Sequence, residues 1–156
     1  MAPLLGKGPK CKACGSELQP TAIDRMSGTA GRVEVTLFGM PGLACPQNHE
    51  KRYIDPDFGD ELAGVVSGKI PKTSMKGFVS RRHSCSNCGA PLEPAVAQTG
   101  TVAIPLELRK GGPFRLEIRV PLLRCPSCDH EQVTQDLGLE IFEAMANAFI
   151  GANLRP

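Results

Sequence analysis

The chain has 156 residues, a net charge of +2, 17 glycines and 14 prolines, but no Trp, one Tyr and six Phe. This length allows one domain or two small ones, but with so few large core residues each small half would bury too little apolar surface to be stable through its core alone. The near-neutral charge does not by itself indicate an acidic partner such as nucleic acid.

The seven cysteines are candidates for the missing stabilisation. Near the start, only Leu4 and Leu5 form an apolar core, which is not the pattern of a signal peptide, and no apolar run approaches the ~18 residues of a membrane span. We therefore expect a soluble, cytoplasmic protein without membrane contact. In a reducing compartment, paired cysteines favour metal binding over disulfides, and an odd number fits a disulfide framework badly.

The sequence contains an internal repeat. A C-x-x-C-G-x-x-L-x-P block, a P-x-x-x-C-P block and an acidic helix start occur in the same order in both halves. In the first and second half respectively, these blocks are Cys11–Pro20 and Cys85–Pro94, Pro41–Pro46 and Pro121–Pro126, and Asp57–Leu62 and Asp136–Ile141.

The repeat predicts two sets of four metal ligands. Cys128 lies eight residues before Asp136, and the same count back from Asp57 arrives at His49. His49 therefore takes the place of the missing eighth cysteine; a surface histidine, with water as the fourth ligand, is the alternative. The predicted ligands are Cys11, Cys14, Cys45 and His49 at the first site and Cys85, Cys88, Cys125 and Cys128 at the second.

The cysteine spacing is typical of zinc knuckles. Two thiolates separated by two residues share a tight turn whose N–H groups point at the sulfurs, and two such turns close a tetrahedron around Zn²⁺. Gly15, Gly89 and Asp129 follow knuckles and suit the positive φ that such turns require. The knuckle from Cys45 to His49 is one residue longer than that from Cys125 to Cys128, which suits a histidine ligand because imidazole reaches farther than a thiolate. We expect two Zn²⁺ per chain.

Between the knuckles of the first half, alternating apolar and polar residues predict strands near Thr21–Arg25 and over Arg32–Leu37, joined by a turn at Ser27–Gly31. A short helix should follow from Pro56 or Asp57 to Val66, where Gly68 is a stop signal.

The second half repeats this order, with strands near Thr101–Leu108 and over Arg115–Val120 and a turn at Lys110–Pro113. A longer amphipathic helix begins at Asp136, and Gly151 could cap its end. Its wide apolar stripe fits packing on a ribbon or contact with a second chain, and both alternatives stay open.

Positive charge gathers between the repeats. The stretch from Ser67 to Ser84 has no acidic residue, and its Gly, Pro and Ser content predicts an extended linker. Such a linker is more often solvated, but it could also follow a phosphate backbone. Its basic residues are Lys69, Lys72, Lys76, Arg81 and Arg82.

Together these patterns predict a small, metal-stabilised α+β fold of two duplicated zinc-ribbon β-hairpin modules, each followed by a helix. The expected boundaries are residues 1–66 for the first ribbon, 67–84 for the linker and 85–156 for the second ribbon.

The C-x-x-C-G knuckle, the strand, the G-x-P-x-x-x-C segment Gly39–Cys45 and the acidic helix start resemble the YgiT-type zinc finger, the zinc-binding half of the MqsA antitoxin family. The resemblance implies a structural zinc and a protein-binding ribbon. The second repeat departs from the pattern, with Arg119–Pro121 in place of Gly39–Pro41, and His49 departs from the family's four cysteines. The family's DNA-binding helix-turn-helix domain has no counterpart here, which argues against a DNA-binding regulator.

Three function classes follow. The first is a non-catalytic zinc protein that presents a surface to a protein partner, as an interaction or adaptor module. The second is a nucleic-acid-binding or transcription-related zinc ribbon that uses the basic linker. The third is rubredoxin-like electron transfer by iron, which the low aromatic content and the histidine ligand disfavour. We do not expect an enzyme, because a site with four protein ligands has no open position and no catalytic motif is present.

Overall fold

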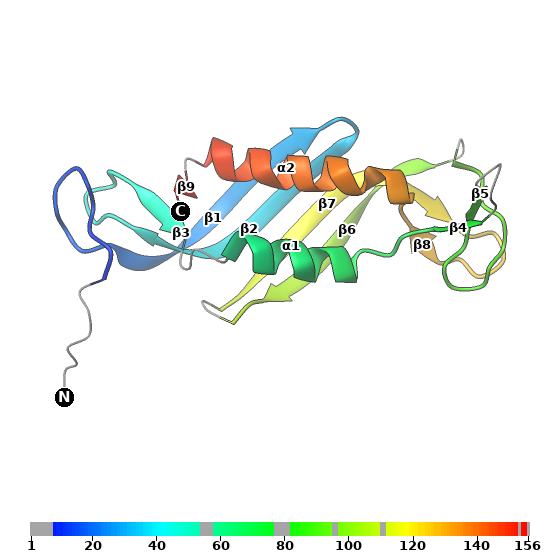
Figure 1. Ribbon diagram of the computed structural model, residues 1–156, viewed down its shortest axis with the longest axis horizontal. Coiled ribbons are helices and arrows are strands. Elements are labelled where there is room, and N and C mark those ends of the chain that lie inside the picture. Colours follow the sequence, from blue (N-terminus) through cyan, green and yellow to red (C-terminus); the bar gives the residue numbers. More distant parts are fainter. Residues whose placement is uncertain are drawn as a thin grey trace.

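The computed structural model describes residues 8–53, 58–76, 82–94, 97–109, 112–152 and 154–155. Figure 1 shows an elongated molecule in which two helices lie across one face of a sheet. In chain order the elements are β1 (Gln19–Ala30), β2 (Val33–Ala44), β3 (Lys51–Tyr53), α1 (Phe58–Lys69), β4 (Ser74–Lys76), β5 (Arg82–Ser84), β6 (Gln98–Glu107), β7 (Pro113–Arg124), β8 (Glu131–Gln132), the 3-10 helix η2 (Gln135–Leu137), α2 (Gly138–Gly151) and β9 (Leu154–Arg155).

Two long antiparallel hairpins, one from each half of the chain, form the centre of the sheet. β1 pairs with β2, and β6 pairs with β7. The hairpins join edge to edge, because β2 pairs with β7 and places Glu34 opposite Arg119 and Phe38 opposite Arg115. An isolated hairpin is marginal in water, so this joining gives both hairpins a shared apolar face. The predicted α+β class is confirmed, and both hairpins belong to one sheet.

The core lies between this face of the sheet and the helices. The alternation predicted for Arg32–Leu37 and Arg115–Val120 is present: the apolar members are buried, and Glu34, Arg115 and Arg119 are exposed on the opposite face. A half-solvated antiparallel sheet has this pattern. From the helices, the buried side chains include Leu62 and Val66 of α1 and Ile141, Ala144, Met145 and Ala148 of α2.

Each helix covers the hairpin of the other half. α2 packs on β1 and β2. α1 lies against the second hairpin, because the Phe58 ring stacks on Phe114 of β7 with centroids 6.1 Å apart and Lys69 Nζ donates to the Pro105 carbonyl of β6 at 3.3 Å. None of the helices in the described part of the chain is long and apolar enough to cross a membrane.

The same kind of hydrogen bond holds each helix to the hairpin of the other half. Glu140 of α2 accepts the backbone N–H of Arg32 at the tip of the first hairpin at 3.2 Å, and Glu61 of α1 accepts that of Arg109 after β6 at 2.9 Å. Glu61 and Glu140 occupy the same position of the sequence repeat. In both repeats, therefore, the helix packs on the hairpin of the other half.

The first hairpin turn is shorter than predicted. Ser27–Ala30 continue β1, where they pair with Val33–Thr36, and only Gly31 and Arg32 form the turn. The prediction was wrong because it assigned Gly28 to a turn. A Cβ at Gly28 would overlap backbone atoms of α2, so this glycine serves the close approach of the helix.

The first helix is also longer than predicted, because α1 passes Gly68 and ends at Lys69. A glycine costs a helix only about 1 kcal/mol, and Ile70, buried at the helix end, favours continuation. Pro71 then disfavours helical geometry for the residue before it.

The predicted linker contains strands rather than only extended chain. β4 pairs with β5, with Met75 opposite His83, while residues 77–81 lie outside the described residues. The domain boundaries after residues 66 and 84 stay predictions.

Candidate metal centres

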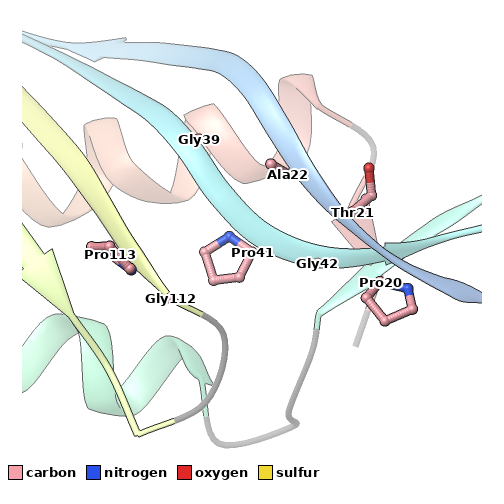
Figure 2. A pocket seen from close by; sticks show the side chains of 8 residues that line it. All are labelled: Pro20, Thr21, Ala22, Gly39, Pro41, Gly42, Gly112 and Pro113. Carbon is pink, nitrogen blue, oxygen red and sulfur yellow. The ribbon is translucent and has the colours of Figure 1, made fainter.

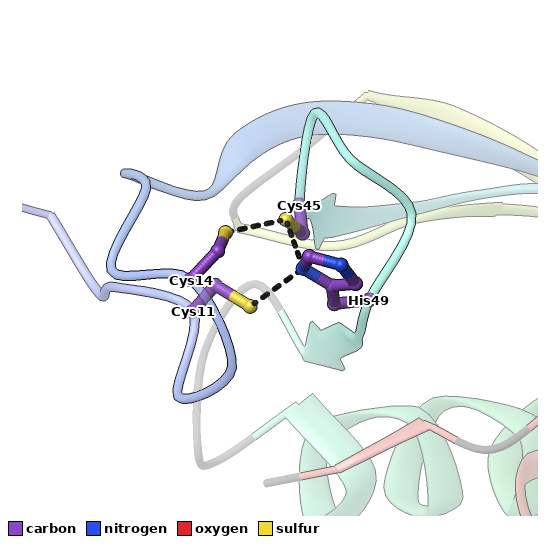
Figure 3. A group of neighbouring side chains, drawn as sticks. All are labelled: Cys11, Cys14, Cys45 and His49. Atoms are coloured by element: carbon purple, nitrogen blue, oxygen red, sulfur yellow. Dashed lines mark hydrogen bonds between the residues drawn. The ribbon is translucent and has the colours of Figure 1, made fainter.

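The first candidate centre lies at the end of the molecule where β2 turns into β3. Cys11 and Cys14 come from the loop before β1, and Cys45 and His49 come from the turn between β2 and β3 (Figure 3). His49 Nδ1 lies 3.8 Å from Cys11 Sγ and 3.7 Å from Cys45 Sγ, and the Sγ atoms of Cys14 and Cys45 are 3.5 Å apart. The predicted histidine thus points a ring nitrogen into the sulfur cluster.

The second candidate centre has the same construction at the other end of the sheet. Cys85 and Cys88 lie in the loop after β5, and Cys125 and Cys128 lie in the turn between β7 and β8. The Sγ atoms of Cys85 and Cys128 are 3.6 Å apart, and those of Cys88 and Cys125 are 3.5 Å apart.

These spacings fit a tetrahedral metal ion. With bonds of about 2.3 Å to sulfur and 2.0–2.1 Å to nitrogen, the ligand atoms around Zn²⁺ lie about 3.5–3.8 Å apart. Within each group, the four candidate atoms are all within 4.8 Å of one another. All eight predicted ligands are therefore brought together, in two groups of four, and each group can hold one metal ion.

Backbone hydrogen bonds shape the first knuckle of each centre. The Cys11 N–H donates to the Ser16 carbonyl and the Gly15 N–H donates to the Cys11 carbonyl, both at 2.8 Å. The Cys85 knuckle repeats both bonds, with Gly89 donating to Cys85 at 2.9 Å. Gly15 and Gly89 have φ of 75° and 81°, in the left-handed region that favours glycine.

The second knuckles close with backbone turns of equal length, although the two ligands are one residue farther apart in the first half. The Cys45 N–H donates to the Glu50 carbonyl, and the Cys125 N–H donates to the His130 carbonyl, both at 3.0 Å across six residues. What differs is the left-handed residue, which is Asn48 at φ 60° in one turn and Asp129 at φ 63° in the other. In the first half the ligand, His49, follows the left-handed residue. In the second half the ligand, Cys128, precedes it.

A partly buried ion pair supports the first centre. Arg52 Nε donates to Glu50 Oε2 at 3.2 Å, and Glu50 Oε1 accepts the Lys12 N–H at 2.7 Å. Hydrogen bonds from Arg52, followed by that from Lys12, lower the pKa of Glu50 to about 2. Glu50 and Arg52 thus join the second knuckle to the first, between Cys11 and Cys14.

At the second centre, Gln132 joins the two knuckles. Its side chain is 0% exposed, its Nε2 donates to Cys85 Sγ at 3.3 Å and its Oε1 accepts the Ser86 N–H at 2.9 Å. Sequence analysis missed Glu50 and Gln132 because they stand at different positions of the repeat. Their sequence signal is a polar residue within four positions after the last ligand of the knuckle, in or next to a short strand.

The thiols of the metal-free centres differ in proton affinity. Hydrogen bonds with Ser16 lower the pKa of Cys14 to about 6. Burial raises the pKa of Cys85, but hydrogen bonds from Gln132 and nearby backbone groups outweigh it and bring that pKa to about 5. A backbone hydrogen bond from Ala90 lowers the pKa of Cys88, yet neighbouring thiols and burial raise it to about 12. A metal ion binding at the second centre must displace a proton from Cys88.

Of the five residues predicted to contact nucleic acid, the structure describes the side chains of Lys69, Lys72 and Arg82. Lys69 Nζ donates to the Pro105 carbonyl, and Lys72 Nζ donates to Ser67 Oγ at 3.4 Å, so both bind their own chain. Arg82 is exposed in β5. Arg81 and the side chain of Lys76 lie outside the described residues.

A separate depression of about 380 Å³ lies beside the first hairpin (Figure 2). Among the described residues, its lining has no titratable side chain. The lining residues are Pro20, Thr21, Ala22, Gly39, Pro41, Gly42, Gly112 and Pro113.

No protein-family model, curated protein or solved structure matches the chain, and the function must be argued from the two candidate metal centres.

Proposed function

We propose that this protein is a non-catalytic zinc protein in which two zinc ions stabilise a scaffold that binds a protein partner. The observation that carries the proposal is the convergence of four ligand atoms within 4.8 Å at each end of the sheet. Three or four thiolates with at most one imidazole are the ligand set of structural zinc sites.

The ligand count supports a structural role for both ions. A catalytic zinc keeps one position for water or substrate, whereas four protein ligands fill the tetrahedron. The supporting groups act in the same direction, because Gln132 and the Glu50–Arg52 pair fix the knuckles in place. We infer a fold that depends on zinc, in agreement with the structural zinc that the resemblance to YgiT-type fingers implies.

A partner surface is supported by the outer side of α2. Among the described residues, the large apolar side chains that are exposed are both on this helix: Leu139 is 69% and Ile150 is 74% exposed. Ala146, also exposed, lies between them at helical spacing, so the three share one side of α2, with the exposed Glu143 next to them. One exposed leucine needs no explanation, but three exposed apolar residues on one side of a helix fit contact with an apolar protein surface.

Elemental analysis and native mass spectrometry of the purified protein test the metal. We expect a colourless protein with two zinc ions per chain. One ion, none, or iron in place of zinc would contradict the proposal.

A photo-reactive amino acid at Ile150, with one at Thr101 as the matched control on an exposed position of β6, tests the partner. We expect a discrete crosslinked protein from the Ile150 position, lost in Leu139→Ser, and none from Thr101. Equal crosslinking at both positions, or none, would contradict an interaction role for α2.

A further inference from the structure

We propose that the two metal sites are thermodynamically coupled, so that filling either one tightens binding at the other. The inference rests on the metal-binding part of the proposed function and goes beyond it. Its basis is that the two helices run in opposite directions along the molecule (Figure 1), each leading from the chain that follows one knuckle toward the chain that follows the other.

α2 leads from the second site to the first. It follows β8 and η2, which come directly after the Cys125–Cys128 knuckle. After its fourteen residues, which span about 21 Å, Ala152 lies with Asn48 and His49 around one small depression. β9 then pairs in parallel with β3, with Leu154 opposite Lys51, and Leu154 is buried at 8% exposure. The end of α2 is therefore held by the strand that follows the His49 knuckle.

α1 leads from the first site to the second. Its first residue, Phe58, stacks on Tyr53 of β3 with centroids 6.3 Å apart. Beyond its end, the Val133 N–H donates to the Pro71 carbonyl at 2.9 Å, and the Thr73 N–H donates to the Val133 carbonyl at 2.8 Å. Gln135 Nε2 adds a bond to the Thr73 carbonyl at 2.7 Å. The segment after α1 is thus held by the chain that follows the Cys128 knuckle.

The strands that hold the helix ends also support the ligands. At the first site, β3 contains Arg52, whose partner Glu50 accepts the N–H of Lys12 between two ligands. At the second site, Gln132 directly precedes Val133 and donates to Cys85 Sγ. Metal binding at either site that orders the adjoining segment therefore also orders one end of a helix. The other end of that helix leads toward the other metal site.

Reciprocity follows from linkage. If a metal at one site favours docked helices, and docked helices favour ordered ligands at the other site, each ion must raise the affinity for the other by the same factor. Typical coupling between sites changes affinity about 5- to 150-fold. We expect the coupling factor of this protein in that range.

Tyr53 is a natural reporter for the first site. It is the only tyrosine of a chain without tryptophan. Its ring packs edge-on against Phe149 of α2 with centroids 5.6 Å apart, in addition to its stacking on Phe58. Tyrosine fluorescence therefore responds to docking of both helices beside β3.

The test titrates Co²⁺ into the metal-free full chain and reads its d–d absorption together with Tyr53 fluorescence. The proteins compared are wild type, Cys45→Ser, in which the first site lacks a ligand, and Cys125→Ser, in which the second does. We expect the second site of Cys45→Ser to bind Co²⁺ about 5- to 150-fold more weakly than that of wild type with its first site filled. Filling the second site of Cys45→Ser should still change Tyr53 fluorescence.

A truncation after Ala152 keeps all eight ligands and removes β9, so it tests the connection without damaging a site. We expect it to reduce the coupling factor by at least threefold, whereas Thr101→Ala, an exposed change on β6, should leave it unchanged. The coupling would be overturned if the wild-type titration equals the sum of the two single-site curves and Tyr53 fluorescence does not change when the second site fills. The proposal of two bound ions would still stand. An unchanged coupling factor after truncation would also overturn the proposed coupling. Absence of any metal binding would overturn the proposed function as well.

Discussion

Replacing Gly28 by alanine should displace α2 from the sheet. A Cβ at this position would overlap the carbonyl oxygen of Ala144 and the amide nitrogen of Ala148, and would lie 2.8 Å from the carbonyl carbon of Asn147. Contacts closer than 3.4 Å are already tight for a Cβ. The helix must therefore move by more than half an ångström, and all three obstructing atoms are backbone, which no change of rotamer can relieve.

Overpacking of a core costs about 1–3 kcal/mol, and more where backbone must shift. For Gly28→Ala we expect a loss at or above the upper end of this range, because α2 carries several fully buried side chains that would move with it. Gly64→Ala is the matched control. It adds the same methyl group to α1, where nothing lies within 4 Å, and it should raise the free energy of unfolding by about 0.5–1 kcal/mol through helix propensity.

Urea denaturation of the zinc-loaded proteins, followed by circular dichroism, measures both changes. A Gly28→Ala protein within 1 kcal/mol of wild type would show that α2 does not sit on β1 at this point. The crossed arrangement of the helices would then be wrong.

Three further predictions concern the metal. Glu50→Gln should weaken zinc binding at the first site and Gln132→Ala at the second, each about 10–100-fold, while Glu17→Gln should weaken neither. Competition with a chelator measures these affinities. Equal effects of one substitution on both sites would contradict the prediction. Because the pKa of Cys88 is raised to about 12, its thiol is protonated at pH 7 and zinc must displace that proton. The affinity for zinc at the second site should therefore rise at least about tenfold per pH unit from pH 6 to 8, with proton release in calorimetry. A flat profile would show that zinc displaces no proton from Cys88. On acidification, the site with His49 should release zinc at a higher pH than the four-cysteine site, because imidazole must be neutral to bind. His49→Cys should bring the two release pH values closer together. Release from the second site first would reverse this order.

The ligand groups follow from local sequence. A C-x-x-C turn brings its two sulfurs together by backbone geometry alone, whatever the rest of the chain does. The repeat then identifies the partner knuckles, and counting from Asp57 places His49 among the ligands, where its Nδ1 lies within 4 Å of two sulfurs. The strands were also predictable, because period-2 alternation reflects one buried face. Their ends were not, since Gly28 reads as a turn residue until α2 is packed on it.

The arrangement of the two halves was decided only by the tertiary structure. Counted back from the cysteines, buried Leu37 corresponds to Glu117, which lies on the solvated face of the sheet. The buried residues of β2 change from odd to even positions at Gly39, which has φ 69°, so that Leu37 and Met40 both reach the core. Periodicity in the sequence does not assign a helix to a hairpin, because both helices have an apolar face of the same period. The choice depends on contacts between distant residues, such as Phe58 on Phe114 and α2 on Gly28, which exist only once both halves have folded together.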